Sequence, residues 1–303
     1  MRGRLSSLGV VATMAAVAGC SATPFRASER FVLDVPGGGY ERVVVRTVNG
    51  NVGLFCEARD DIRINAVKRS RGVTLAEAEE TLDQLTIFAA ADENDPTTFR
   101  IELDVPPELK RLSPGADFEI YVPDSCAAEI VTDNGYVRVR GVEGLAQLCS
   151  SNGRIIAEDV EGRVDAHTSN GRIAVNSLIG DCRLDTSNGE ITVREAQGSV
   201  EATTSNGSIF VEATPTADGK VVLLTSNGSI RVIVPEDLPA DLHLDSSNGR
   251  VRARLRDASW NTTSHSNSTT WGVRFEHVDT SINGGGCRID AKTSNGSVTL
   301  DCR

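Results

Sequence analysis

The residues of this sequence that could take part in acid–base catalysis are charged ones, and they alternate with apolar residues along the chain. The closest grouping sets His167 beside Asp165 and Asp185, the arrangement that a general base requires. The charges around it alternate in sign, however, which is typical of a solvated sheet with cross-strand ion pairs. The sequence also has no nucleophile elbow, P-loop or HExxH motif. We therefore expect no catalytic residue, no metal site and no cofactor.

The first cysteine suggests where the protein resides. Arg2 and Arg4 precede an apolar run over residues 8–18, which is too short for an ordinary transmembrane helix. The run ends in Val17-Ala18-Gly19-Cys20, which resembles the cleavage box of bacterial lipoprotein signal peptides. This resemblance implies a signal peptide over 1–19 and lipid on Cys20. Because Ser21 follows, it also implies sorting to the outer membrane or cell surface. An ordinary secretory signal is the alternative.

The other cysteines do not form an evident disulfide scaffold, although an exported protein can carry disulfides. Cys182 falls in a column with Val164 and Val200, so we expect it to pack as a small hydrophobic side chain. Cys287 and Cys302 begin and end the last repeat. We predict that these two form a disulfide bond that closes the C-terminus.

The two tryptophans, Trp260 and Trp271, fall in a stretch rich in Ser, Thr and Asn. Long loops of this kind are usually functional or disordered. Two interpretations stay open: the rings contact a sugar or a protein partner, or they pin the loop against the rest of the fold.

A repeat of 18 residues should position all these groups. Its mark is a tetrapeptide ending in Asn-Gly, and Gly135, Gly153, Gly171, Gly189 and Gly207 close successive copies. Between the glycines, β-branched and small residues alternate with polar ones, which indicates strands with one buried face. Asn and Gly both tolerate positive φ, so we expect the chain to reverse direction there by that means.

The repeat predicts an all-β fold, namely a β-solenoid whose 18-residue rungs each contain two strands. Equivalent Ser and Asn side chains would then lie about 4.8 Å apart and hydrogen-bond along the stack. The alternative is an antiparallel β meander or sandwich, because Asn-Gly is also a strong hairpin signal.

We divide the chain into four parts after this pattern. Residues 1–19 form the signal peptide and 20–30 a tether. Residues 31–117 carry strands and one helix over 74–85, where Thr74 and Glu77 form a capping box. Residues 118–303 form the repeat domain, with a loop insertion over 257–285. Within this domain, Val122-Pro123 and Val234-Pro235 precede two related blocks.

Charge limits the choice of partners. The formal net charge is −11, and removal of residues 1–19 with their two arginines makes it −13. A nucleic-acid-binding surface needs a basic patch, so we expect no nucleic-acid partner. A membrane, a glycan or another envelope protein is the expected partner.

The Asn-Gly turns, the stretch from Val122 to Val137 and the lipoprotein leader together resemble the bacterial "putative adhesin" domain family of unknown function. They are also similar to head domains of auto-transporter adhesins. The resemblance covers residues 31–303 and implies a β-solenoid with an adhesive or envelope-surface role. It supplies no catalytic residues. The expected function is therefore a lipid-anchored, non-enzymatic adhesin-like protein. The alternatives are an envelope accessory or sensor protein and, third, a carbohydrate-active enzyme.

Overall fold

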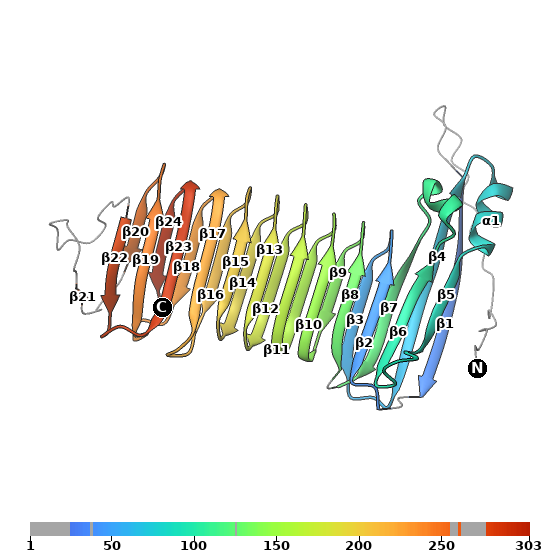
Figure 1. Cartoon of the computed structure of the whole chain (residues 1–303), viewed down its shortest axis with the longest axis horizontal. Helices are drawn as coiled ribbons and strands as arrows, with labels where there is room; N and C mark the ends of the chain where they lie inside the picture. The colour runs from blue at the N-terminus through green and yellow to red at the C-terminus, as the bar shows by residue number, and fades with distance from the viewer. Residues whose placement is uncertain (1–24, 37–38, 125, 255–259, 262–276) are drawn as a thin grey trace.

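The chain forms a long rod of two β-layers with a helix at its N-terminal end (Figure 1). The computed structural model describes residues 25–36, 39–124, 126–254, 260–261 and 277–303. Besides strands it contains one α-helix, α1 (Leu75–Asp83), and one short 3₁₀ helix, η1 (Pro107–Leu112). The predicted all-β solenoid is confirmed.

Each rung of the repeats consists of a strand in a first layer, an Asn-Gly turn and a strand in a second layer. In spatial order the first layer contains β5 (Thr86–Ala91), β6 (Thr98–Asp104), β2 (Arg42–Thr47), β8 (Ala127–Thr132), β10 (Glu143–Ser150), the second half of β11 (Ile155–Thr168), β13 (Cys182–Thr186), β15 (Val200–Thr204), β17 (Lys220–Asn227), β23 (Cys287–Asn295), β19 (Ala240–Ser246), β22 (His277–Ile282) and β21 (Trp260–Asn261). The second layer contains β1 (Phe25–Pro36), β4 (Asp61–Gly72), β7 (Gly115–Pro123), β3 (Val52–Glu57), β9 (Val137–Arg140), the first half of β11, β12 (Ile173–Ile179), β14 (Ile191–Gln197), β16 (Ile209–Ala213), β18 (Ile230–Val234), β24 (Val298–Cys302) and β20 (Val251–Arg254).

Rungs stack in parallel and in register, so the meander alternative is wrong for the repeats. Ile155 pairs with Ile173, and Ile173 with Ile191, at the sequence spacing of the repeat. The alternating apolar residues of both layers face each other and form one continuous buried core. Among the described residues, antiparallel pairing is confined to strands near the two ends, such as β1 with β4 and β22 with β19.

Two polar ladders follow the Asn-Gly edge of the rod, as the stacking hypothesis predicts. Each asparagine after the first donates its side-chain N–H to the side-chain oxygen of the preceding one at 2.6–3.1 Å, along the row Asn49, Asn134, Asn152, Asn170, Asn188, Asn206, Asn227, Asn295 and Asn248. A Thr or Ser hydroxyl beneath each turn donates to the glycine carbonyl of an adjacent rung; Thr168, for example, donates to Gly153 at 3.1 Å. These bonds satisfy polar groups that the stack buries.

The reason for glycine in these turns differs from the predicted one. The turn glycines are not among the glycines with positive φ. A Cβ on Gly171 would instead lie 1.8 Å from the carbonyl oxygen of Gly153, and one on Gly153 would lie 1.6 Å from that of Gly135. Close approach of backbones, rather than chain reversal, therefore requires glycine there. Positive φ occurs at the opposite edge, for example at Gly162 with φ 136°.

The order of rungs in space differs from their order in sequence near both ends. The β2–β3 rung lies between β6–β7 and β8–β9. The C-terminal β23–β24 rung lies between β17–β18 and β19–β20. The connections that pass an inserted rung are those that contain Pro123 and Pro235. This explains the two blocks seen in the sequence, because the chain must there advance by two strand spacings instead of one.

Outward side chains join each inserted rung to both of its neighbours. On β3, the Phe55 ring stacks on Tyr121 of β7, with centroids 5.4 Å apart, while the guanidinium of Arg138 of β9 lies 6.0 Å from the Phe55 centroid. On β24, Asp301 accepts from Arg231 of β18 at 2.8 Å and from Arg254 of β20 at 3.4 Å.

The N-terminal end differs in its boundaries from the sequence prediction. Strand β1 starts at Phe25, so residues 25–30 of the predicted 20–30 tether are a strand, and 20–24 lie outside the described residues. Helix α1 is capped by Thr74, which accepts from the Glu77 backbone N–H at 3.1 Å. The Glu77 carboxylate accepts from the Val73 N–H at 2.6 Å rather than from that of Thr74, so the predicted capping box is present only in part. The helix packs against β4 and β1.

The C-terminal insertion contains more structure than the predicted loop over 257–285. Strand β22 occupies His277–Ile282 and pairs with β19, and Val278 and Ile282 are buried. Asn283-Gly284 follows this strand, but sequence analysis missed it because the strand pairs antiparallel with β19 and lies outside the 18-residue repeat.

Candidate binding surface

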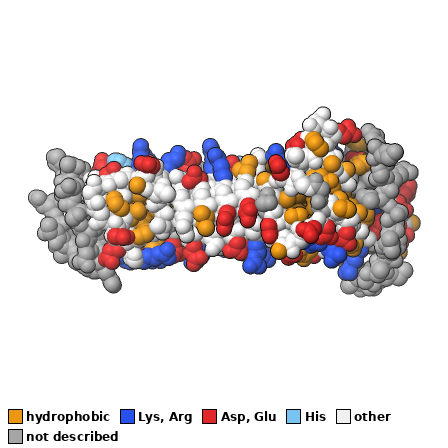
Figure 2. Space-filling model, turned by 90° about the horizontal axis from the view of Figure 1, so that it is seen from below, with side chains coloured by type: hydrophobic (Ala, Val, Ile, Leu, Met, Phe, Trp, Pro, Cys, Tyr) orange, Lys and Arg blue, Asp and Glu red, His pale blue; other side chains and the backbone are white. Residues whose placement is uncertain are grey.

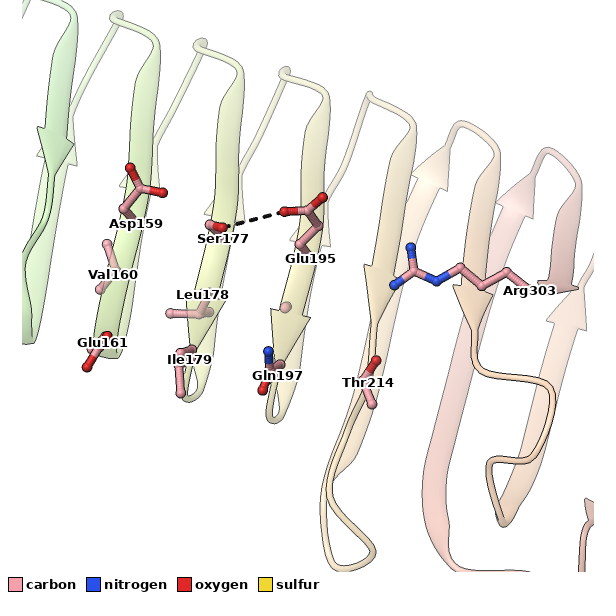
Figure 3. Close-up of a pocket in the computed structure, with 11 residues that line it drawn as sticks. Asp159, Val160, Glu161, Ser177, Leu178, Ile179, Glu195, Gln197, Thr214 and Arg303 are labelled. Atoms are coloured by element: carbon pink, nitrogen blue, oxygen red, sulfur yellow. Dashed lines mark hydrogen bonds between the residues drawn. The ribbon is translucent and has the colours of Figure 1, made fainter.

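A groove of about 460 Å³ crosses the outer surface of the second layer in the middle of the rod (Figure 3). It crosses β11, β12 and β14 and ends near Thr214 and the C-terminal Arg303. Arg303 reaches it because the inserted C-terminal rung ends on this layer, where Arg303 pairs with Glu212. Figure 2, which views the rod from below, shows acidic side chains along the middle rungs.

Three residues in left-handed backbone conformation shape this groove. Asp159, Ser177 and Glu195 have φ values of 51°, 57° and 53°, and Gly141 occupies the equivalent position one rung earlier with φ 73°. Left-handed backbone is costly for residues other than glycine. It interrupts the alternation of the strand, so a polar side chain points outward immediately before buried Val160, Leu178 or Ala196.

The groove offers oxygen atoms and a few apolar contacts. Asp159 accepts from Arg140 at 3.0 Å, and the Ser177 hydroxyl lies 3.5 Å from a carboxylate oxygen of Glu195. Ile179 adds an apolar side chain that is 54% exposed. An open, shallow site with these groups can hydrogen-bond a hydroxyl-rich or peptide ligand.

Glycine in place of Ser177 should stabilise the protein, because the left-handed conformation costs about 1–3 kcal/mol for a residue with a Cβ. The entropy that glycine loses on folding offsets roughly 0.5–1 kcal/mol of this gain. We expect Ser177→Gly to raise the free energy of unfolding by about 1 kcal/mol, measured by urea denaturation. Ser169→Gly, at a half-buried turn position outside the left-handed column, is the control and should not stabilise. Equal or lower stability of Ser177→Gly would show that the backbone there is unstrained.

The general-base interpretation of His167 finds no support in the geometry. His167 projects from the first layer, and its cross-strand neighbour is Asp185. Asp165 accepts from Arg163 at 2.9 Å and Asp185 from Arg183 at 3.5 Å, so both carboxylates already pair with arginines on their own strands. The alternating charges predicted cross-strand ion pairs, whereas these two pairs each lie within one strand.

The predicted disulfide between Cys287 and Cys302 is not formed in the structure, where both thiols are free. Cys287 begins β23 in the first layer and Cys302 ends β24 in the second. Packed sheets lie about 10 Å apart, whereas a disulfide requires Cα atoms within about 7 Å. Cys182 is buried in the core as predicted, 3% exposed.

The thiols of three cysteines should make the free energy of unfolding decrease at alkaline pH. Burial raises the pKa of Cys182 to about 12 and the pKa values of Cys287 and Cys302 to about 11. A thiol in the unfolded chain ionises near pH 8.5. Between this pH and the folded pKa, the folded state therefore keeps thiol protons that the unfolded state has lost. The stabilisation is complete below the unfolded pKa and is lost as pH rises through the folded one.

We expect Cys182 alone to account for a loss of about 3 kcal/mol between pH 7.5 and pH 10.5. The measurement is urea denaturation of the wild type and of Cys182→Val at both pH values. The variant should lose less stability than the wild type over this interval. Equal losses would contradict the prediction.

The other site residues predicted from sequence are only partly covered by the structure. Cys20 and Trp271 lie outside the described residues. Trp260 belongs to β21, which pairs with β22, but its side chain is not described. Among the described residues, no group of three or more His, Cys, Asp or Glu side chains could hold a metal ion. No helix in the same part of the chain is long and apolar enough to cross a membrane.

Comparison with known proteins assigns the family. A family model described as Toastrack DUF4097 matches residues 21–301, nearly the whole chain. The chain belongs to this family. No curated protein matches the Toastrack chain in sequence.

Two solved structures resemble the Toastrack chain at low identity. One is the "putative cell adhesion protein" of Clostridium sporogenes, with 9% identity and a TM-score of 0.27; the match covers 91% of this chain and 100% of the other. The second is the "putative adhesin" of Bacteroides fragilis, with 10% identity and a TM-score of 0.42, covering 91% and 97%.

Sequence reasoning did not find the groove of this Toastrack chain. The signal was present, because residues 141, 159, 177 and 195 recur at the repeat spacing and the first is a glycine. In each rung, buried and outward-facing residues alternate along the strand. The left-handed residue is one additional position between an outward-facing residue and the next buried one. A search for such additions to the alternation would have located the column.

Proposed function

We propose that this protein is a lipid-anchored, adhesin-like component of the bacterial cell envelope that binds through the outer surface of its rod. Lipid on Cys20 holds it in the outer membrane or at the cell surface, and the solenoid displays the binding surface. The ligand is a glycan or another envelope protein. The role is non-enzymatic.

The observation that carries this proposal is the groove with its left-handed column. Strained backbone in folded proteins is concentrated at functional sites, and here it is repeated on three adjacent rungs. The groove is open and lies on a scaffold whose turns are hydrogen-bonded from rung to rung. A rigid scaffold limits the entropy lost on binding.

The test compares glycan-array and envelope-fraction binding of the wild type with two matched variants. Ile179→Asp changes an exposed apolar residue in the groove, and Leu224→Asp changes one on the first layer, 39% exposed. We expect Ile179→Asp to weaken binding at least tenfold and Leu224→Asp to leave it unchanged. Equal effects of both variants, or no binding by the wild type, would refute the groove as the binding surface.

The same experiment separates the alternatives. Recovery of one envelope protein without glycan binding favours the accessory or sensor function. Release of reducing ends or unsaturated sugars, abolished by His167→Ala, would instead identify an enzyme. Loss of acylation and of membrane fractionation in Cys20→Ser is the expected result for the anchor.

A further inference from the structure

Two arginines at the N-terminal end of the rod occupy an unfavourable position relative to each other. Strands β1 and β4 pair antiparallel, and their register sets Arg26 directly opposite Arg71. Both residues are exposed, and like charges directly opposite on a sheet destabilise it. Neither arginine has an ion pair among the described residues, whereas their neighbours do: Lys68 pairs with Glu29 at 2.6 Å and Arg69 with Asp117 at 2.6 Å.

Apolar side chains flank this pair. Phe25 precedes Arg26 and is 50% exposed; Val73 follows the end of β4 and is 79% exposed. Phe25 is the cross-strand partner of Gly72, so the register brings both ends of the tip together. We call Phe25, Arg26, Arg71 and Val73 the basic tip. The Glu77 carboxylate is hydrogen-bonded to the backbone of the basic tip, where it accepts from the Val73 N–H at 2.6 Å.

The position of the basic tip in the chain indicates its partner. Five residue steps separate Phe25 from Cys20, and a chain of this length spans at most about 18 Å. A lipid on Cys20 would therefore hold the basic tip at the surface of the bilayer. Cationic side chains beside apolar ones are the composition that binds the interface of anionic membranes.

We propose that Arg26 and Arg71 bind phosphate groups of phospholipid headgroups, with Phe25 and Val73 entering the membrane interface. The rod then stands on the membrane by its N-terminal end. This inference rests on the proposed lipid attachment at Cys20. Headgroup phosphates relieve the repulsion between the arginines, whereas a second copy docked on the same tip would add two more positive charges.

The first experiment uses the secreted chain from residue 20 with Cys20→Ser, so that no lipid contributes. Each arginine near an anionic surface strengthens binding roughly fivefold. We expect sedimentation with phosphatidylglycerol vesicles, and about 25-fold weaker binding after Arg26→Gln with Arg71→Gln. The matched control, Arg250→Gln with Arg252→Gln, removes the same charge at the opposite end and should bind like the parent. Equal binding of the two double variants, or no binding to anionic vesicles, would overturn the proposal.

The second experiment uses the lipidated protein in vesicles that contain brominated phospholipid. A fluorophore on Ser28→Cys, close to the basic tip, should be quenched at least threefold more than one on Ser169→Cys in the middle of the rod. The double variant at the tip should lose this difference while it remains acylated and membrane-bound. Equal quenching in the wild type would overturn the proposal, as would self-association in place of vesicle contact. Loss of acylation with vesicle binding intact would refute only the anchor at Cys20.

Discussion

Replacing Gly171 by alanine is expected to unfold the middle of the rod. The new Cβ would lie 1.8 Å from the Gly153 carbonyl oxygen and 2.5 Å from its carbon. Both belong to the backbone, so no flexible side chain can move aside to make room. Rungs on both sides would have to separate, with loss of ladder hydrogen bonds and of core packing. A destabilisation above roughly 4 kcal/mol is of the size that such a mechanism produces.

The measurement is the thermal midpoint of Gly171→Ala and of Ser169→Ala, which changes a half-buried side chain in the same turn. We expect the glycine variant to melt at least about 10 °C lower or to fail to fold, and the serine variant to melt like the wild type. Asn170→Ala removes two ladder bonds without a clash and should fall between them, because each bond contributes about 1 kcal/mol. A midpoint of Gly171→Ala within about 2 °C of the wild type would mean that adjacent rungs are further apart than described here.

Deletion of residues 287–303 is expected to disorder the chain from β17 onward, although it removes only the C-terminus. The deleted rung lies between β17–β18 and β19–β20, so its loss removes pairing partners on both sides. Ile289, Ala291 and Leu300 are fully buried and would leave a gap through the core. Trimming the end of an ordinary stack would cost only one interface.

Hydrogen exchange detects this effect strand by strand. In the truncated protein, the amides of residues 220–246 should lose protection while those of residues 155–197 keep it. A peptide of residues 287–303 added in trans should restore protection, and a scrambled peptide of the same composition should not. Unchanged protection of residues 220–246 in the truncated protein would show that β19–β20 can pair directly with β17–β18.

Most of the rod could be predicted from sequence because a periodic chain repeats the same local physics at every rung. Ile155, Ile173 and Ile191 each indicate one strand with an inward-facing side chain, and the spacing of the turn glycines gives the register between these strands. The Asn row also followed from stacking alone. The repeat period does not predict the spatial order of the rungs, because the β23–β24 sequence fits the pattern equally well at the end of the stack or inside it.

The candidate site was less predictable, for two physical reasons. The left-handed residues Asp159, Ser177 and Glu195 are two acids and a serine, and similar polar residues occupy the other outward positions, so composition does not mark them. The opposition of Arg26 and Arg71 depends on an antiparallel register that joins residues far apart in the sequence. The predicted disulfide is not formed in the structure, because Cys287 and Cys302 lie in different layers and the sequence pattern does not show the separation of the layers.

The row of asparagine amides has a direction. Every N–H in it points toward the N-terminal end, from Asn248 through to Asn49, which in turn donates to the Pro114 carbonyl. Aligned amide dipoles add, as they do along an α-helix, so this edge of the rod is electrically positive at its base and negative at its far end. If the N-terminal end of one rod met the C-terminal end of another, their amide dipoles would align and attract. Two rods that met by their C-terminal ends would bring like partial charges together and repel along this edge.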